Sequence, residues 1–292
     1  MNSKSVFVIL NYNSKEDTKN LVQNINKILD IPIVIVDNCS PSNDYEELKK
    51  LETKNVKVIK SNRNGGYAYG NNLGIEYAIR EFNPKYIFIA NPDIIINKSV
   101  VDEMLKVIQQ DEKIGIVAPK MKTNNPKSLS AWKMPSLKDD IVLSISLLNR
   151  IFGNPLKYKS EICLKNAPVE VDVVQGAFFL VNVNALKKVG FFDEKTFLYG
   201  EERILAYKMK QKDYKVIFLP YVYFEHNVSN SVKKSFTNLN VYKFLLNSRI
   251  IYHKYYLKQS TLKINLLKIS FIIGKIEKYI IYAFYNFFKG NR

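Results

Sequence analysis

The segment Tyr86-Ile87-Phe88-Ile89-Ala90-Asn91-Pro92-Asp93 joins a run of apolar residues to a turn that carries a carboxylate. The apolar run predicts a buried β-strand. Pro92 cannot donate to a sheet ladder, so we expect the strand to end before it and Asp93 to project from the strand's carboxyl end. Ligands of open α/β sheets bind beyond that edge. The alternative for Asn-Pro-Asp taken alone is ordinary turn chemistry.

Similar short runs occur three times before this segment, at residues 6–10, 33–36 and 56–59. Segments with helical spacing, such as Leu21, Ile25 and Ile28, separate them. The alternation predicts an α/β fold with a mostly parallel sheet flanked by helices. Directly beyond Asp93 we expect a helix at 100–110 and a strand at 114–118 ended by Pro119. A loop or hairpin at 120–135 and an irregular insertion with one helix at 139–168 should follow. In the remaining part we expect strands at 169–174, 178–183 and 215–219, and helices at 185–189 and 204–211.

The composition limits the class of protein. A chain of 292 residues with 47% apolar and 13% aromatic content can bury a substantial core, as one large domain or a domain with an appendage. Cys39 and Cys163 form neither a disulfide framework nor a CxxC metal pair, which favours a reducing compartment. The sequence contains no apolar stretch long enough for a membrane span, and the first apolar run is too short for a signal peptide. We therefore expect a cytosolic protein.

The net charge of +17 is concentrated near the end of the sequence. Residues 233–292 hold 12 lysines and arginines against one acid, Glu277, and lysines alternate there with isoleucine, leucine and aromatic residues. This pattern predicts a domain at 1–232 followed by a basic amphipathic helical tail at 233–292. Such a tail suits an anionic membrane surface better than nucleic acid, whose binding arms are more polar. The alternatives are a helix packed on the body and a contact in a homodimer.

Polar residues follow each of the first four predicted strands. They are Asn11, Asp37, the run Ser61-Asn62-Arg63-Asn64-Gly65-Gly66, and Asp93. Each alone fits a cap or a turn, but their recurrence at one sheet edge predicts a ligand site. The glycines before Asn71 could bring backbone N–H groups to an anion. Their spacing matches neither a Walker loop nor a dinucleotide fingerprint.

Acids and a histidine further along complete a candidate site. Glu201 and Glu202 follow aromatic residues just before a predicted helix. Apolar surroundings can raise a carboxylate's pKa toward the range of a general base, although helix capping is an equal alternative. His226 follows the strand at 215–219. A lone histidine is usually structural, yet beside Asp93 it could complete a Mg²⁺ or Mn²⁺ shell with two phosphate oxygens.

In their order, these motifs resemble the inverting family 2 glycosyltransferases of bacterial polysaccharide assembly. The resemblance runs from about Val6 to His226 and implies a GT-A fold, a Rossmann-like variant of the α/β class. The motifs that carry it are Val8-Ile9-Leu10-Asn11-Tyr12-Asn13, Val36-Asp37-Asn38, Asn64-Gly65-Gly66-Tyr67-Ala68, Gly70-Asn71-Asn72, Asn91-Pro92-Asp93, Gln175-Gly176-Ala177-Phe178-Phe179-Leu180, Val189-Gly190-Phe191-Phe192-Asp193-Glu194 and Tyr199-Gly200-Glu201-Glu202.

The resemblance implies a role for each candidate residue. It implies a dTDP- or UDP-sugar donor, with Asp37 and Asn11 at the base and ribose. Asp93 corresponds to the surviving acid of the family's metal-binding Asp-x-Asp, His226 to its second protein ligand, and Glu202 to the catalytic base, with Glu201 as the alternative. The remaining implied donor-binding residues are Asn64, Gly66, Asn71 and Asn91.

The sequence departs from the family pattern at three positions. Asn91 replaces the first acid of Asp-x-Asp, a form common in rhamnosyltransferase-like members. Glu202 replaces an aspartate, and Ile204 stands where an acid often follows. The resulting hypothesis is a metal-dependent inverting glycosyltransferase of capsule or O-antigen type. It would sit peripherally on the inner face of the cell membrane and act on a lipid-linked saccharide, with dTDP-rhamnose favoured and UDP-hexose next. The alternatives are a nucleic-acid-binding protein and a sugar-nucleotide nucleotidyltransferase.

Overall fold

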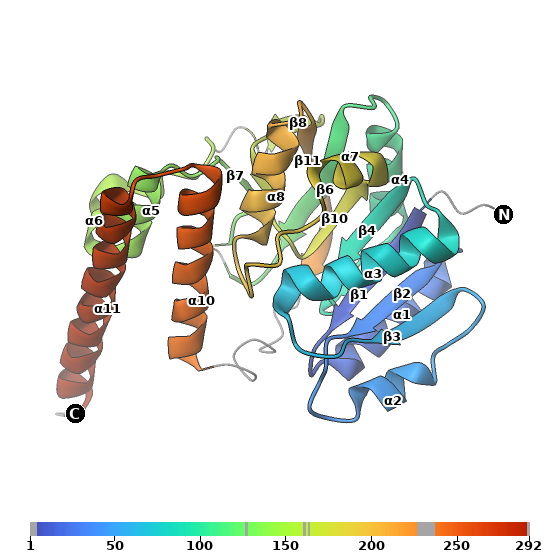
Figure 1. The fold of residues 1–292 in the computed structure, drawn as a ribbon, viewed down its shortest axis with the longest axis horizontal. Coiled ribbons are helices and arrows are strands. Elements are labelled where there is room, and N and C mark those ends of the chain that lie inside the picture. The colour runs from blue at the N-terminus through green and yellow to red at the C-terminus, as the bar shows by residue number, and fades with distance from the viewer. Residues whose placement is uncertain (1–4, 126–127, 160–161, 163, 227–236, 291–292) are drawn as a thin grey trace.

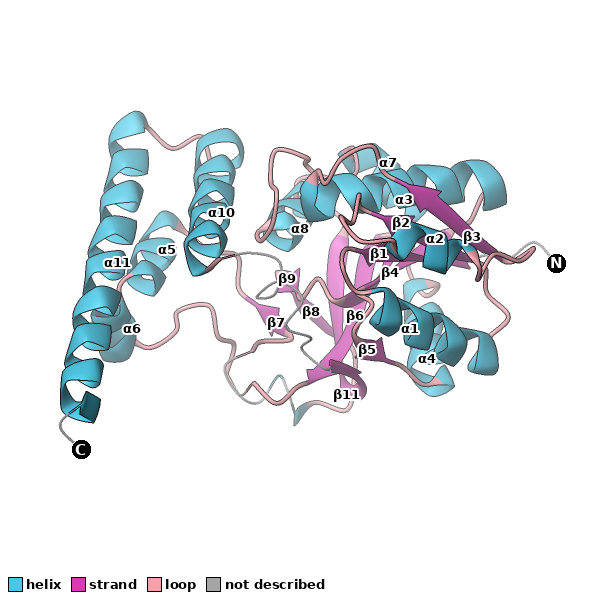
Figure 2. Cartoon of the chain, turned by 90° about the horizontal axis from the view of Figure 1, so that it is seen from below, coloured by secondary structure: helices cyan, strands magenta, loops and turns pink. Residues whose placement is uncertain are grey.

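The computed structural model describes residues 5–125, 128–159, 162, 164–226 and 237–290. At its centre is a nine-stranded sheet with the strand order β3-β2-β1-β4-β10-β6-β11-β5, and β8 pairs with β11 outside this path. Helices cover both faces of the sheet, and a group of helices stands to one side of it (Figure 1). Figure 2 shows the same arrangement from below.

The first four predicted strands form the parallel half of the sheet. They are β1 (Ser5–Asn11), β2 (Ile33–Asp37), β3 (Val56–Lys60) and β4 (Tyr86–Ala90). β1 pairs in parallel with both β2 and β4, and β2 pairs in parallel with β3. The register sets Asn11 beside Asp37. The carboxyl ends of these strands therefore meet at one edge, and the predicted α/β class is confirmed.

Two apolar cores lie on the two faces of the sheet. α1 (Lys15–Ile28) and α4 (Lys98–Ile108) cover one face, where Leu21 and Met104 are fully buried or nearly so. α3 (Gly66–Phe82), α7 (Val183–Val189) and α8 (Glu201–Lys210) cover the other, where Ile75 and Leu205 lie in the core. Each such buried aliphatic side chain contributes about 1.5–3 kcal/mol. The short α2 (Asp44–Lys49) joins β2 to β3.

The second half of the sheet is mixed. Its strands are β5 (Ile94–Ile95), β6 (Ile114–Lys122), β8 (Val169–Val171), β10 (Phe178–Asn182) and β11 (Lys215–His226), and a separate pair joins β7 (Ala131–Trp132) to β9 (Val173–Val174). β10 runs antiparallel between β4 and β6. Its first residues therefore lie at the carboxyl end of β4.

Two predicted strands end too early. β6 continues through Pro119 to Lys122, because β10 pairs only with Ile116 and Val117 and leaves the later part of β6 with one sheet neighbour, β11. A proline is tolerated where a strand lacks a partner on one side. β11 continues past Leu219 to His226 through an irregularity in its pairing with β6. The expected loop or hairpin at 120–135 is thus shorter, and it contains β7.

A group of helices forms the side unit seen in Figures 1 and 2. It combines α5 (Leu137–Ser144) and α6 (Ser146–Phe152) with α10 (Asn238–Ile251), the π-helical turn η2 (Tyr252–Tyr256) and α11 (Thr261–Gly290). The insertion thus holds two helices where one was expected. Its helices join those of the predicted tail, and α11 packs on α5 and α10. Among the helices in the described ranges, none has both the length and the apolar character needed to cross a bilayer.

Candidate active site

The Asp93 carboxylate and the His226 imidazole lie together at the end of β4. Oδ1 of Asp93 is 3.2 Å from Nε2 of His226, and both side chains are mostly buried. The antiparallel pairing of β11 with β5 sets His226 beside Ile94 and so brings the imidazole to the Asn-Pro-Asp turn. On its other side the ring contacts Met121, with Nδ1 3.2 Å from the sulfur. Two residues far apart in the sequence are therefore adjacent in the fold, as predicted.

Gly176 lies between this turn and the acid pair. The backbone N–H of Asn91 donates to the carbonyl of Ala177 at 2.7 Å, which continues the β4–β10 pairing beyond the strand. Directly before Ala177, Gly176 packs against the side chain of Glu202, and a Cβ added there would lie 2.6 Å from Oε1 of that glutamate. The Asn-Pro-Asp turn and Glu202 thus contact the same short segment.

Glu201 and Glu202 open α8, directly after Gly200, whose φ of 86° suits glycine. Glu201 is buried and Glu202 is half-buried. Burial and the neighbouring charge of Glu202 raise the pKa of Glu201 to about 8, and burial also raises the pKa of Glu202. Within the described residues, Oε1 of Glu201 has no hydrogen-bond partner. The pair therefore favours holding a proton, on the more deeply buried Glu201.

The turn that begins α3 contacts the segment leading to these acids. The φ of Gly66 is 89°, and a side chain on it would clash with the carbonyl of Phe197. The N–H of Tyr67 donates to that carbonyl at 2.9 Å, and the Tyr67 hydroxyl donates to the carbonyl of Gly176 at 2.6 Å. Burial and the charges of Glu202 and Glu201 hold the pKa of Tyr67 well above its usual value. Only glycine at position 66 permits this close approach.

Asparagine side chains hold the same turn in place. Nδ2 of Asn38 donates to Oδ1 of Asn64 and to the carbonyl of Gly66, both at 3.1 Å. Asn71 is fully buried and donates to the carbonyl of Tyr67 at 3.0 Å. In the part of the chain that the structure describes, the buried Oδ1 atoms of Asn38 and Asn71 accept no hydrogen bond. These amides therefore leave two buried acceptors beside the turn.

Asn11 and Asp37 lie at neighbouring strand ends, as predicted, but both are fully buried. Nδ2 of Asn11 donates to Asp37 at 2.9 Å and to Asp44 at 3.0 Å. Asp37 also accepts from the hydroxyl of Ser40 at 2.6 Å. The two side chains thus organise the loop that follows β2. Their direct contact with a nucleotide stays a prediction.

A buried charge cluster between α8, α5 and α10 was not predicted. Asp140 of α5 pairs with Arg203 and His253 at 2.7 Å each, and with Arg249 at 3.2 Å. Burial alone would raise the pKa of Asp140, but the charges of Arg203 and Arg249 hold it well below its usual value. Arg203 directly follows Glu202. The cluster therefore links the helix of the acid pair to α5 and α10.

Helix α10 also contacts the segment before the acid pair. The rings of Phe244 and Phe197 lie 4.5 Å apart between centroids. The hydroxyl of Ser248 donates to the carbonyl of Leu198 at 3.0 Å, and its Cβ lies beside Gly200. Phe197 is thus held between α3 and α10. No sequence motif predicted these contacts, because the residues that make them are separated by about 50 residues of sequence.

The geometry permits two kinds of chemistry. A half-buried carboxylate beside a protonated acid can remove a proton from an alcohol. A carboxylate oxygen about 3 Å from an imidazole nitrogen can share a divalent ion, for which both are suitable ligands. Among the described residues, no group of three or more histidines, cysteines or acids forms a complete metal shell. Asp93 and His226 therefore fit an ion whose other ligands come from a substrate or water.

Comparison with known proteins gives one family. Residues 6–190 match the Glycosyl transferase family 2 model. The low-salt glycan biosynthesis hexosyltransferase Agl10 of Haloferax volcanii is 30% identical over 207 residues, which are 70% of this chain and 61% of that protein. The rhamnosyltransferase WbbL of Escherichia coli is 24% identical over 200 residues, which are 64% of this chain and 72% of that protein.

A solved structure shares the fold. A mannosyltransferase from Pyrobaculum calidifontis, in complex with GDP-mannose and Mn²⁺, aligns with a TM-score of 0.57 at 14% identity over 91% of this chain and 73% of its own. This confirms the predicted GT-A fold. The family match ends before the acid pair and His226, so their roles rest on geometry. The family match also argues against the two alternative functions, a nucleic-acid-binding protein and a sugar-nucleotide nucleotidyltransferase. By the match over residues 6–190, the chain belongs to Glycosyl transferase family 2.

Proposed function

We propose that this protein transfers a sugar from a nucleotide-sugar donor to a hydroxyl of a saccharide acceptor, with inversion at the anomeric carbon. One observation carries the proposal. The turn that holds Asp93 and the side chain of Glu202 both contact the segment Gly176–Ala177, the turn through the N–H of Asn91. An inverting transfer needs a proton acceptor on one side of the reacting carbon and a site for the leaving diphosphate on the other. Glu202 and the Asp93–His226 pair provide for both.

Glu202 is the proposed general base. Its side chain is half-buried and lies against Gly176, whereas Glu201 is buried and carries a proton at neutral pH. Glu202 takes the proton of the acceptor hydroxyl while that oxygen forms its bond to the anomeric carbon. The bond from that carbon to the diphosphate breaks on the opposite face, and the diphosphate leaves with the electron pair.

Asp93 and His226 are the proposed protein ligands of a divalent ion, Mg²⁺ or Mn²⁺. With its proton on Nδ1, facing the Met121 sulfur, the imidazole presents the lone pair of Nε2 toward Asp93. When bound, the ion would offset the charge of the leaving diphosphate. Asn91 supplies no carboxylate, so most of the remaining ligands would be donor phosphate oxygens and water.

The donor is proposed to lie along the carboxyl edge of β1–β4. Asn64, Gly66 and Asn71 shape the turn at the start of α3, where the buried Oδ1 of Asn71 offers a hydrogen-bond acceptor. Asn11 and Asp37 would act by holding the loop after β2. A dTDP-rhamnose donor is favoured because of the Asn-Pro-Asp form, and UDP-hexose is second. The relatives include a hexosyltransferase and a rhamnosyltransferase, so both classes of donor are to be tested.

A lipid-linked saccharide is the proposed acceptor, in the synthesis of a bacterial surface polysaccharide such as capsule. The support is the tail, whose 12 basic residues against one acid and whose exposed apolar side chains suit an anionic membrane surface. Peripheral attachment at the cytoplasmic face would place the enzyme beside such acceptors. A homodimer contact through the tail is the alternative.

The test is a donor screen on the full chain. Purified protein with Mn²⁺ is heated with dTDP-rhamnose, UDP-hexoses and GDP-mannose, and a bound donor should raise Tm. The stabilising donor is then incubated with prenyl-diphosphate-linked saccharides. Release of the nucleoside diphosphate and a product of inverted anomeric configuration by NMR are expected. The proposal is wrong if no nucleotide sugar binds or turns over, or if the anomeric configuration is retained.

A further inference from the structure

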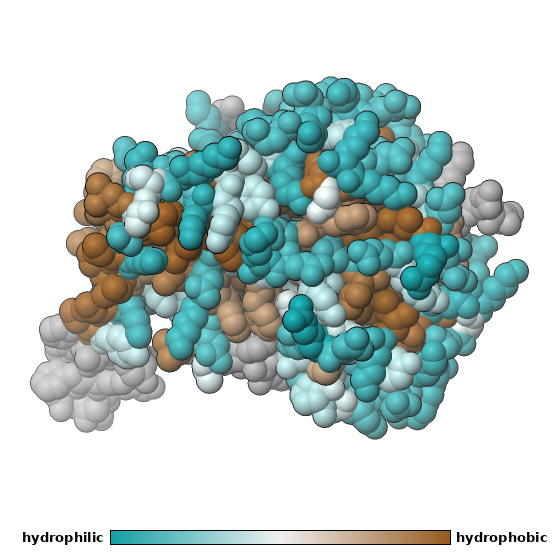
Figure 3. All heavy atoms as spheres, in the orientation of Figure 1, coloured by the Kyte–Doolittle hydropathy of each residue, from teal (hydrophilic) through white to brown (hydrophobic). Residues whose placement is uncertain are grey.

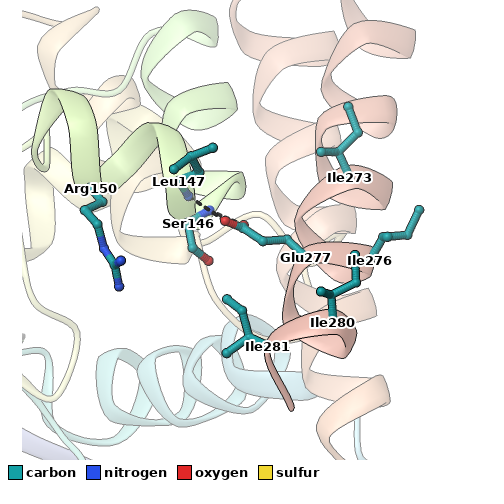
Figure 4. A pocket seen from close by; sticks show the side chains of 8 residues that line it. All are labelled: Ser146, Leu147, Arg150, Ile273, Ile276, Glu277, Ile280 and Ile281. Carbon is teal, nitrogen blue, oxygen red and sulfur yellow. Dashed lines mark hydrogen bonds between the residues drawn. The ribbon is translucent and has the colours of Figure 1, made fainter. Parts of the chain in front are cut away.

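A groove of about 390 Å³ lies between α6 and α11 (Figure 4). Ile273, Ile276 and Ile280 of α11 line one side, and Leu147 and Arg150 of α6 line the other. The isoleucines are each about half exposed. The groove is therefore mainly apolar, and its polar lining consists of Ser146, the Arg150 guanidinium and the Glu277 carboxylate.

Close packing fixes the two helices that form the groove. Gly274 contacts the carbonyl of Ser144 at the end of α5, where any side chain would clash. The Glu277 carboxylate accepts from the N–H groups of Ser146 and Leu147, both at 2.6 Å, and caps α6 (Figure 4). The one acid of residues 233–292 is thus engaged within the protein. The exposed charges of the described part of the tail are accordingly positive.

The exposed apolar surface extends beyond the groove. Leu262, Leu266, Ile269, Ile273, Ile276 and Ile280 recur at alternating spacings of four and three along α11. Each has about half or more of its surface exposed. Ile151 and Phe152 of α6 are exposed as well, at 63% and 70%. Apolar residues gather over α11 in Figure 3. A continuous apolar stripe of this kind is unusual on a monomer and marks a contact surface.

Lysines accompany this stripe. Lys263, Lys268, Lys275 and Lys278 lie on the same helix, and all but Lys275 are exposed. A dimer formed along the stripe would bring together two tails that each carry 12 basic residues against one engaged acid, which opposes self-association. An anionic surface neutralises the lysines and also offers hydrocarbon to the isoleucines.

We propose that the α6–α11 groove seats hydrocarbon chains of anionic phospholipids when the protein lies on a membrane, with Arg150 against the lipid phosphates. The inference rests on the proposed membrane attachment and names the surface that makes it. The stripe buries its isoleucines among acyl chains, and α6 supplies the second wall. Both walls are needed, so a change in either one weakens the attachment.

Vesicle flotation of the full chain tests this inference. Wild type should float with phosphatidylglycerol–phosphatidylcholine vesicles and much less with pure phosphatidylcholine. The double substitution Ile273→Asp and Ile276→Asp should reduce the partition constant at least about tenfold, since each isoleucine loses its apolar contact. Arg150→Gln, which removes the basic side chain that lines the groove, should reduce it about fivefold, and only on anionic vesicles.

Matched controls separate the groove from general apolar exposure. Leu164→Asp and Ile95→Asp alter exposed apolar residues elsewhere and should float like wild type. Nucleoside diphosphate release with a water-soluble acceptor should be equal in wild type and in the groove variant, which shows that both are folded. Flotation of the groove variant at the wild-type level would overturn the inference. So would a wild type that does not float but forms a dimer which the groove substitutions dissociate. Flotation without any sugar transfer would instead overturn the proposed function alone.

Discussion

The Asp140 carboxylate of α5 lies 2.7 Å from the Arg203 guanidinium of α8, and both side chains are almost completely buried. Arg203 directly follows Glu202 in the sequence. The ion pair therefore connects α8, the helix that begins with the acid pair, to α5 of the side unit.

Removing this carboxylate should destabilise the fold strongly. Asp140→Asn keeps the shape of the side chain but leaves Arg203 and Arg249 buried without their counter-charge, which typically costs about 3–5 kcal/mol. Urea unfolding followed by circular dichroism measures the change. Asp102→Asn is the control, because it breaks an exposed ion pair with Lys98 and should cost no more than about 1 kcal/mol. Equal losses in the two variants would contradict the structural role of Asp140.

The two glutamates should differ in catalysis. Glu202→Gln should lower kcat by about 10²–10⁴ and leave donor affinity almost unchanged, because it removes the proposed proton acceptor. Glu201→Gln preserves the protonated, uncharged state of Glu201 and should retain most of the activity. Steady-state kinetics and calorimetric titration of the donor test both. If Glu201→Gln is the inactive variant, Glu201 is the base instead.

Glu201 should make stability depend on pH. Its pKa is near 4.5 in an unfolded chain and is raised to about 8 in the fold. Between these values the unfolded chain releases a proton that the folded protein keeps, so the contribution of Glu201 to stability is lost as pH rises from about 5 to 8. Glu201→Gln should therefore gain stability over wild type across this range, by a few kcal/mol. Parallel urea titrations at pH 5, 7 and 9 should show a growing gap. A constant gap would mean that Glu201 is not held protonated.

Metal dependence should follow Asp93. Chelator should abolish transfer, and Mn²⁺ should restore it. Asp93→Asn should weaken Mn²⁺ binding at least about tenfold, because even outer-shell partners of metal ligands are worth this much. Titration of Mn²⁺ in the presence of the nucleoside diphosphate, followed by electron paramagnetic resonance, measures the affinity, and Asp102→Asn should bind like wild type. Full turnover in excess chelator would refute the metal proposal.

Gly176 should matter through Glu202. The Cβ of Gly176→Ala would lie 2.6 Å from Oε1 of Glu202 and would push that flexible side chain aside. A displacement of about 1 Å can cost about 10² in kcat, while Tm should change little. Combining Gly176→Ala with Glu202→Asp shortens the displaced side chain, so the two effects should be less than additive in a double-mutant cycle. Strict additivity would show that the two positions are independent.

The sequence predicted the parallel half of the sheet well, for a physical reason. Buried parallel strands are continuous apolar runs, and the residues 86–90 matched β4 at both ends. β6 and β11 were both predicted too short, β6 because Pro119 was expected to end the strand. Whether a proline ends a strand depends on its neighbours in the sheet, and a single sequence does not contain this information.

The candidate site was predicted in part. Asp93 and His226 meet because β5 pairs with β11. The family resemblance implied that the two residues act together, but the strand pairing was not predicted. The Asp140 cluster could not be found in this way. Arg203, Arg249 and His253 lie 63 to 113 residues after Asp140, and buried charges look like surface charges in a sequence. Likewise, the burial of Asn11 and Asp37 follows from packing that a strand-end position does not reveal.

The contact between Phe244 and Phe197 has a consequence for preparing the enzyme. A protein truncated at the predicted boundary of residue 232 would keep every proposed catalytic and metal-binding residue. It would lose Phe244, Ser248 and Arg249, and with them the support behind Leu198 and one of the counter-charges of Asp140. Such a fragment would keep the residues proposed for catalysis but lose the helix contacts that hold the segment before Glu201 in place. The last helices should therefore be retained in any version of the protein used for assay or crystallisation.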